Sequence, residues 1–160
     1  MNSAIEYVRG DATRPQGDGP KVICHVVNDA GGWGRGFVVA LSRRWPQPEA
    51  AYRRWYKERG SGSGFALGQM QLVPAEPGVW VANMVGQHGI RTRGSDHVPV
   101  RYEAIDQALN HLGDAALRLG ASVHMPRIGT GLAGGRWERI EPLIQDRLVS
   151  RGLTVTVYEL

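Results

Sequence analysis

The stretch CHVVNDAGGWGRGFVVAL, residues 24–41, places four glycines within six positions between two apolar runs. The valine-rich run before the glycines is typical of a strand buried on both faces, and the run after them indicates a helix. A loop at a strand-to-helix junction presents unpaired N–H groups at the positive end of the helix dipole, and glycine lets the backbone turn several of them inward. The sequence therefore predicts an anion site here.

A second glycine-rich loop, RIGTGLAGG at residues 127–135, lies in the same setting. It follows a short predicted strand at 121–126 and precedes the segment 136–152, which is predicted to form a helix with Gly152 just past its end. Two such loops predict one phosphate-bearing ligand held between them. The alternative is that these glycines only form tight turns and allow close packing.

The remaining segments fit an α/β fold. Strand-like and helix-like runs alternate in the second half of the chain, and a predicted hairpin near the middle makes the central sheet mixed. We expect a single domain over residues 1–160, with helices on both sides of the sheet. The other predicted strands are 4–8, 21–27, 66–75, 78–86 and 153–160, and the other predicted helices are 37–45, 48–59 and 102–119.

Composition narrows the function classes. The hydrophobic share of 42% and charged share of 21% are those of a folded protein, and the net charge of +4 suits an anionic ligand. The arginines are scattered, so nucleic acid is not the expected partner. The chain has no long apolar run, and its start does not resemble a signal peptide. We therefore expect a cytoplasmic protein without a membrane segment. The single Cys24 cannot form an internal disulfide and is expected to be buried.

Two common nucleotide-binding fingerprints fail at one position of the first loop. A dinucleotide-binding loop requires a third glycine where this chain has Phe37, and a P-loop requires a lysine there. Gly129, Gly131 and Gly134 match G-x-G-x-x-G formally, but near the end of the chain. Neither loop carries a lysine or a set of metal-binding carboxylates, so we expect no metal and no cofactor.

Four segments together resemble a macrodomain: GDAT at 10–13, HVVNDAGGWGRGF at 25–37, MPRIGTGLAGGRWERI at 125–140 and TVTVYEL at 154–160. Within that family they are most similar to the branch that contains the terminal ADP-ribose protein glycohydrolase. The resemblance implies a macrodomain fold, ADP-ribose as the ligand and ADP-ribosylated proteins as partners.

The resemblance also implies roles for single residues. Asp11 would accept a hydrogen bond from the adenine amino group, with the backbone of Ala12 beside it, although both Asp11 and Asn28 also suit simple turns. The first loop would hold the distal ribose and one phosphate, and the second would wrap the pyrophosphate. The implied loop residues are Asn28, Gly32, Trp33, Gly34, Arg35, Gly36, Ile128, Gly129, Thr130, Gly131, Leu132, Ala133 and Gly134.

The sequence departs from this branch at its catalytic positions. The glycohydrolase uses a lysine and an aspartate, and the corresponding positions here carry Gln87 and Ala133. The two lysines of the chain, Lys21 and Lys57, lie away from the predicted loops. A covalent lysine intermediate is therefore not expected.

Hydrolysis by a positioned water is the remaining route, because a glutamyl carboxylate leaves readily. His88 is a further candidate for proton transfer, whereas His25 fits an interior histidine. The leading hypothesis is a hydrolase of ADP-ribosyl esters on glutamate or aspartate side chains, or of O-acyl-ADP-ribose. A non-catalytic ADP-ribose reader and an ADP-ribose 1''-phosphate phosphatase are the alternatives. The candidates to orient the water or the ribose are Asn28, Asp29, Gln87 and Thr130.

Overall fold

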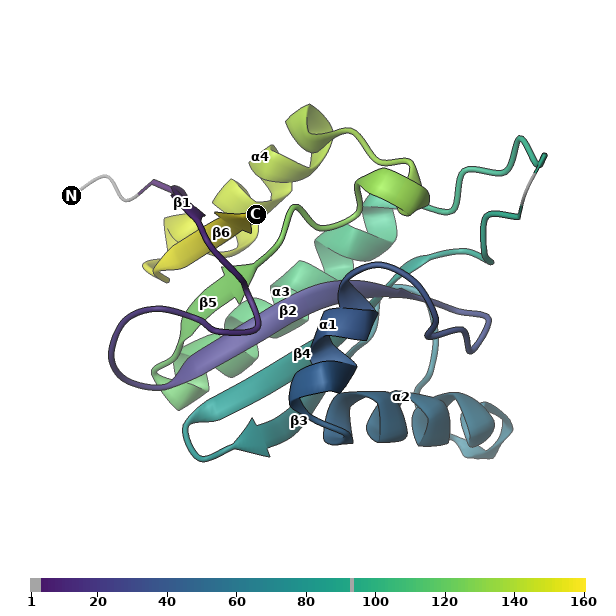
Figure 1. The fold of residues 1–160 in the computed structure, drawn as a ribbon, viewed down its shortest axis with the longest axis horizontal. Helices are drawn as coiled ribbons and strands as arrows, with labels where there is room; N and C mark the ends of the chain where they lie inside the picture. Colours follow the sequence, from purple (N-terminus) through teal and green to yellow (C-terminus); the bar gives the residue numbers. More distant parts are fainter. Residues whose placement is uncertain (1–3, 93) are drawn as a thin grey trace.

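A six-stranded sheet in the order β1-β6-β5-β2-β4-β3 forms the centre of the molecule. The computed structural model describes residues 4–92 and 94–160 (Figure 1). The strands are β1 (Glu6–Arg9), β2 (Lys21–Asn28), β3 (Met70–Glu76), β4 (Val79–Gln87), β5 (Ser122–Met125) and β6 (Val155–Glu159). The helices are α1 (Phe37–Arg44), α2 (Gln47–Lys57), α3 (Tyr102–Leu119) and α4 (Trp137–Arg147), with short 3-10 turns at Arg59–Ser61, Gly131–Ala133 and Val149–Arg151.

The sheet is mixed, as predicted. Strands β3 and β4 form the expected antiparallel hairpin, and every other pair in the sheet is parallel. The predicted α/β fold with a mixed sheet is therefore confirmed. Among the described helices, none is both long enough and apolar enough to span a bilayer.

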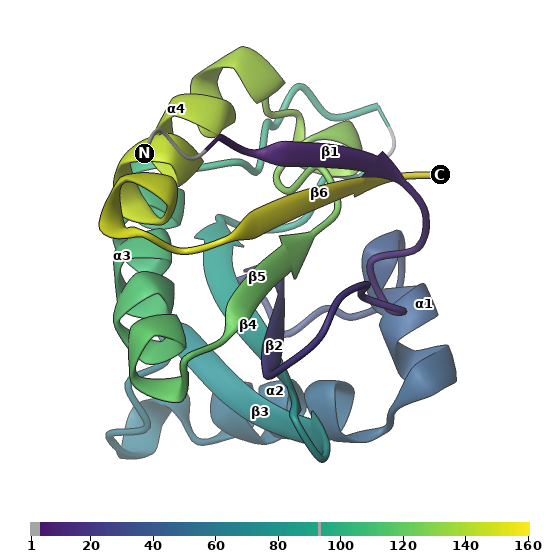
Figure 2. The same cartoon turned by 90° about the vertical axis from the view of Figure 1, so that its left-hand side faces the viewer.

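Two apolar cores lie on opposite faces of the sheet. On one face α3 and α4 pack against β2 residues such as Val22 and Cys24, and on the other α1 and α2 pack against Ile23 and Val27. Figure 2 shows α3 and α4 on one side of the sheet and α1 on the other. Burial raises the pKa of the Cys24 thiol, which behaves as the buried apolar residue that was expected.

The last helix is shorter than predicted. Helix α4 ends at Arg147, and Gly152 follows a separate 3-10 turn rather than the helix itself. Leu148, fully buried at the break, anchors this turn in the core, and its carbonyl accepts a hydrogen bond from the N–H of Leu153 (3.3 Å). The chain can therefore reverse direction and enter β6.

One irregularity in the sheet bears on the site. Strands β2 and β4 pair in step up to Val27 and Val85, after which Asn28 pairs with Gln87 and leaves Gly86 as an extra residue. A Cβ on Gly86 would lie 2.7 Å from Cγ1 of Ile105, so only glycine fits there. This β-bulge brings Asn28 and Gln87 together at the end of the sheet.

Candidate functional site

A large cleft lies where successive strand-to-helix connections switch from one face of the sheet to the other. The neighbouring strands β2 and β5 lead to α1 and α4, which pack on opposite faces of the sheet. Such a topological switch point leaves a crevice at the carboxyl ends of the strands, where ligands of α/β proteins bind. The crevice here has a volume of about 1370 Å³ and lies between the two glycine-rich loops.

Most of the predicted binding residues surround this cleft. It is bounded by the first loop, by the second loop and by the segment that follows β4. Asp11, Ala12, Asp29 and Gly134 do not line it. The predicted residues that do are Asn28, Gly32, Trp33, Gly34, Arg35, Gly36, Gln87, Ile128, Gly129, Thr130, Gly131, Leu132 and Ala133.

Both loops offer free backbone donors. Within the described part of the chain, the N–H groups of Trp33, Gly34 and Arg35 donate no hydrogen bond, and neither do those of Gly129 and Thr130. The first group directly precedes the N-terminus of α1, where the helix dipole is positive. The cleft is therefore suited to an anion that accepts from both walls.

The glycines of the loops fall into two groups. A Cβ on Gly32 would lie 2.6 Å from a side-chain carbon, and one on Gly129 would lie 2.8 Å from another, so close packing explains these two. A Cβ on Gly34 or Gly131 would meet no protein atom within 4 Å. Gly131 also has a φ of +66°, but Gly34 does not adopt a positive φ. Neither packing nor a left-handed backbone thus requires glycine at position 34.

Asn28 organises the first loop. Its Oδ1 accepts hydrogen bonds from the N–H groups of Ala30 (2.9 Å) and Gly32 (3.0 Å), and its Nδ2 donates to the Gly32 carbonyl (3.0 Å). The buried hydroxyl of Tyr52 lies beneath it, donating to the Asn28 carbonyl (2.7 Å) and accepting from the N–H of Gly31 (3.1 Å). The turn-forming role of Asn28 is thus present in the structure.

Asp29 does not line the cleft and instead holds the segment after β4 in place. Its carboxylate accepts from the N–H of Gly89 (2.7 Å) and lies 2.8 Å from Nδ1 of His88. Burial opposes ionisation of Asp29, but the hydrogen bonds from Gly89 and His88 outweigh it and hold the pKa of Asp29 below its usual range. His97 in turn lies 2.5 Å from the His88 carbonyl through its Nε2. Asp29 and His88 therefore position a loop.

The other polar candidates differ in whether their side chains already form hydrogen bonds within the protein. The Thr130 hydroxyl donates to the carbonyl of Arg127 (2.8 Å), which fixes the second loop. Gln87 lines the cleft, and its side-chain amide has no hydrogen bond within the described residues. Of the four predicted catalytic candidates, Gln87 is the one whose side chain forms no hydrogen bond with the described residues, so all its polar atoms are left for a ligand.

The two lysines lie outside the cleft. Lys21 begins β2, at the opposite end of the strand from the glycine loop, and Lys57 ends α2. Neither lines the cleft. Within the described residues, no group of three or more histidine, cysteine, aspartate or glutamate side chains is placed to hold a metal ion.

His25 forms part of the cleft wall but is an interior histidine, as predicted. The amide nitrogen of Asn83 donates to the Pro48 carbonyl and to Oε1 of Gln71. The Oδ1 of Asn83 therefore accepts from Nε2 of His25 (2.5 Å). Burial lowers the pKa of His25 to about 4, and the ring is neutral at pH 7. Its Nδ1 has no partner in the described structure.

Asp11 and Ala12 follow β1, on the same edge of the sheet as the cleft but beyond β6. The N–H of Gly10 donates to the Glu159 carbonyl (2.8 Å), which fixes this position. Oδ1 of Asp11 accepts from both the N–H (2.9 Å) and the hydroxyl (2.8 Å) of Thr13. Asp11 therefore forms a turn, and its predicted contact with adenine stays a prediction.

Among the described residues, four arginines line the cleft, and Asp96 is the one acidic residue of this lining. Arg53 pairs with Glu49 on its own helix, and Arg127 pairs with Glu159. The other two, Arg35 and Arg91, are exposed. The cleft as a whole carries positive charge.

Known proteins resemble the whole of this chain, although no protein-family model matches it. A macrodomain protein from Streptomyces coelicolor is 60% identical, with 98% of this chain and 99% of that chain covered and a TM-score of 0.87. A protein of unknown function from Bacteroides thetaiotaomicron is 51% identical over 98% of both chains, with a TM-score of 0.92.

Curated relatives carry two kinds of name. The chromodomain-helicase-DNA-binding protein 1-like of Danio rerio is 34% identical over 98% of this chain, which spans only 16% of that protein's length. An ADP-ribose 1''-phosphate phosphatase of Meyerozyma guilliermondii is 24% identical over 92% of this chain and 95% of its own length. The match to the Streptomyces protein over the full fold, including both glycine loops, shows that the chain belongs to the macrodomain family.

Proposed function

We propose that this macrodomain binds ADP-ribose in the cleft and hydrolyses ADP-ribosyl esters on glutamate or aspartate side chains. Small O-acyl esters of ADP-ribose present the same bond. The observation that carries the proposal is the pair of loops with free N–H groups on both walls, together with the open space at Gly34 and Gly131. A diphosphate is the anion that matches donors from two facing walls.

The ligand would extend along the carboxyl edge of the sheet. The pyrophosphate would accept from the N–H groups around Gly34 and Gly129, and the distal ribose would lie near Asn28 and Gln87. The adenine would extend past β6 toward Asp11 on the same edge. Oδ1 of Asp11 already accepts two hydrogen bonds, so Oδ2 is the atom left for the adenine amino group.

Water is the proposed nucleophile. Its oxygen attacks the anomeric carbon of the distal ribose, the bond from that carbon to the ester oxygen breaks, and the side-chain carboxylate leaves with the bonding electrons. The proton lost by the water passes to solvent or to the released carboxylate. Gln87 supports this step because its amide can hold the water near the ribose. Neither lysine lines the cleft, so neither is placed to act as the nucleophile instead of water.

Two alternatives have support of their own. The reader hypothesis rests on Gln87 and Ala133, which supply neither the lysine nor the aspartate of the glycohydrolase branch. The phosphatase hypothesis rests on relatives that carry that name and match over nearly their full length.

One set of measurements separates the three functions. The protein is incubated with glutamate-linked ADP-ribosyl protein and with ADP-ribose 1''-phosphate, and released ADP-ribose and inorganic phosphate are quantified. Binding of free ADP-ribose is measured by calorimetry. Release from the ester alone supports the proposal, release of phosphate alone supports the phosphatase, and binding without turnover supports the reader. An absence of binding at millimolar ADP-ribose would reject all three.

A further inference from the structure

The segment between β4 and α3 is a long loop with a well-fixed base. The N–H of His88 donates to the Pro99 carbonyl (2.8 Å), and the N–H of Arg101 donates to the Gly86 carbonyl (2.9 Å). Asp29 adds its hydrogen bonds to the start of the loop. A loop of this length in a compact domain usually has a function of its own. In Figure 1 it extends away from the sheet beside the second glycine loop.

The loop presents one exposed apolar side chain in the cleft and a second beside the adjoining glycine loop. Ile90 is 50% exposed and lines the cleft against the first loop, since a Cβ on Gly32 would lie 2.6 Å from its Cδ1. Val98 is 46% exposed and does not line the cleft, but it lies beside Gly134 of the second loop. Single exposed aliphatic residues are ordinary, but two from one loop that lie against both ligand loops indicate a contact surface.

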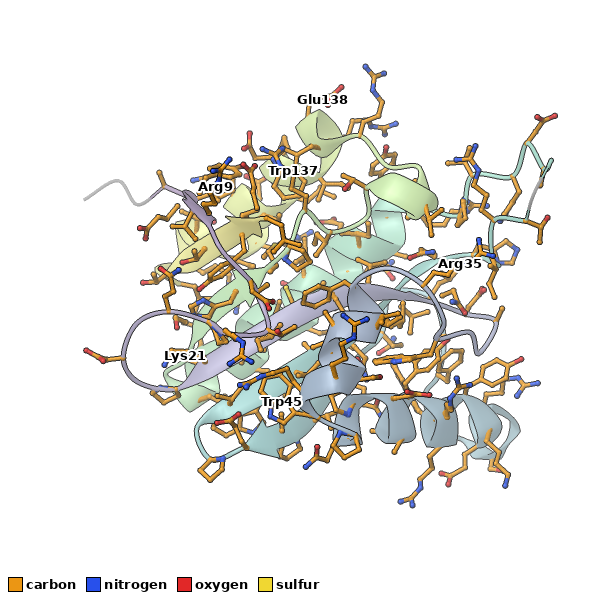
Figure 3. The ribbon with its side chains drawn as sticks, viewed as in Figure 1. Arg9, Lys21, Arg35, Trp45, Trp137 and Glu138 are labelled. Carbon is orange, nitrogen blue, oxygen red and sulfur yellow. The ribbon has the colours of Figure 1, made fainter. Side chains whose placement is uncertain are left out.

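The mouth of the cleft carries two arginines that form no ion pair with any described residue, in contrast to Arg53. Arg91 lies next to Ile90 in the loop, and Arg35 faces the cleft from the first glycine loop. Asp96 also lines the cleft. Figure 3 labels Arg35 on the side of the molecule toward which the loop extends. An acidic partner would complement this charge.

The chemistry of the mouth favours a polypeptide over nucleic acid. Bases of a single strand stack on exposed aromatic rings. The aromatic residues that line the cleft are Trp33, which is 7% exposed, and the half-buried Phe37. Exposed aliphatic side chains beside an arginine match a peptide with apolar and acidic residues.

We propose that Ile90, Arg91 and Val98 form a docking surface for the polypeptide that carries the modified residue. This surface prefers segments in which further acidic residues and an aliphatic residue flank the modified glutamate or aspartate. The proposal rests on the proposed function, because the modification itself occupies the cleft. It assigns substrate choice to the loop after β4 and leaves the ADP-ribosyl group to the glycine loops.

The test compares two ADP-ribosylated peptides with the same modified glutamate. One carries flanking glutamates and a leucine, and the other carries glutamines and a serine in their place. The wild type should process or bind the acidic peptide about tenfold better, as expected for one or two charged contacts plus an apolar one. In Ile90→Ser/Arg91→Gln the preference should fall to about twofold or less, with the affinity of the same variant for free ADP-ribose as the reference. Arg43→Gln is the charge-matched control, because Arg43 is exposed and does not line the cleft.

Three results would overturn the docking surface. Equal processing of both peptides by the wild type would show that the flanks are not read. An equal loss for free ADP-ribose and both peptides in the double variant would assign Arg91 to the phosphates of the ligand. Stronger capture of an ADP-ribosylated oligonucleotide than of either peptide would make nucleic acid the partner. Failure of the wild type to bind free ADP-ribose would instead reject the proposed function.

Discussion

The hydroxyl of Tyr52 donates a 2.7 Å hydrogen bond to the backbone carbonyl of Asn28 and lies 3.0 Å from the Oδ1 of the same residue. Tyr52 is fully buried on α2, and burial raises the pKa of its hydroxyl, so it remains a neutral donor. One interior hydroxyl thus supports the residue that shapes the whole first glycine loop.

Tyr52→Phe should loosen that loop without unfolding the protein. The substitution leaves the N–H of Gly31 and the carbonyl of Asn28 without this partner, at a cost of about 1–3 kcal/mol in the free energy of unfolding. Turnover should fall more than ADP-ribose affinity. Urea unfolding measures the stability, calorimetry measures the ADP-ribose affinity, and release of ADP-ribose from the ester measures the turnover. Tyr56→Phe is the control, because the Tyr56 hydroxyl has no hydrogen bond within the described residues.

Gly34→Val should abolish ADP-ribose binding while the protein keeps its stability. The new side chain would meet no protein atom near its Cβ, but it would occupy the space proposed for the pyrophosphate. Gly60→Val is the matched control, since Gly60 also lacks a positive φ and has open space around its Cβ. Calorimetry on both folded variants decides, and wild-type affinity in Gly34→Val would remove the first loop from the ligand site.

Gln87→Ala should slow ester hydrolysis about ten- to a thousandfold, as expected when a water loses its positioning group. Asn28→Ala should slow it by a similar factor through loss of loop shape and ribose orientation. Binding of free ADP-ribose should change less than turnover in Gln87→Ala. Single-turnover release of ADP-ribose measures the rate.

The lysines should be dispensable for the same reaction. Lys21→Ala and Lys57→Ala should retain wild-type turnover, because neither side chain lines the cleft. Cyanoborohydride added during turnover should trap no covalent ADP-ribosyl adduct. Mass spectrometry of the intact protein is the measurement, and an adduct on either lysine would replace the water mechanism by a covalent one.

Acidification should destabilise the fold in a defined range of pH. Burial lowers the pKa of both His25 and His124 to about 4, whereas an unfolded histidine has a pKa of about 6.5. The unfolded state therefore binds more protons between these values, so stability is fully present above pH 6.5 and falls as the pH drops toward 4. Urea midpoints across this range test the trend. NMR titration of the ring protons should find both folded rings neutral at pH 6, and a ring of His25 already charged there would contradict the assignment.

The sequence predicts well where the two glycine loops lie, because the backbone pattern itself carries that information. Gly34 and Gly131 lie on strand-to-helix junctions, and the apolar runs before them fix which edge of the sheet they occupy. Because the carboxyl ends of neighbouring parallel strands meet at one edge, both loops had to face one cleft.

Tyr52 and Ile90 could not be assigned in the same way. Tyr52 belongs to the buried face of α2, and nothing in its periodicity distinguishes a core residue from one that hydrogen-bonds a distant loop. Ile90 lies in a segment without periodicity, whose course is set by the tertiary hydrogen bonds of Asp29. The helix predicted at 136–152 includes Leu148 because its spacing is helical, but α4 ends at Arg147 and a buried 3-10 turn follows.

The bulge at Gly86 makes the pairing register of β4 as consequential as the identity of its residues. If β2 and β4 paired regularly past Val27, Asn28 would face Gly86, and Gln87 would turn to the opposite face of the sheet. The chain would keep every polar group proposed for the chemistry yet present one of them to the wrong side. A family member that paired these two strands without the bulge could therefore share the fold and the loops while being catalytically silent.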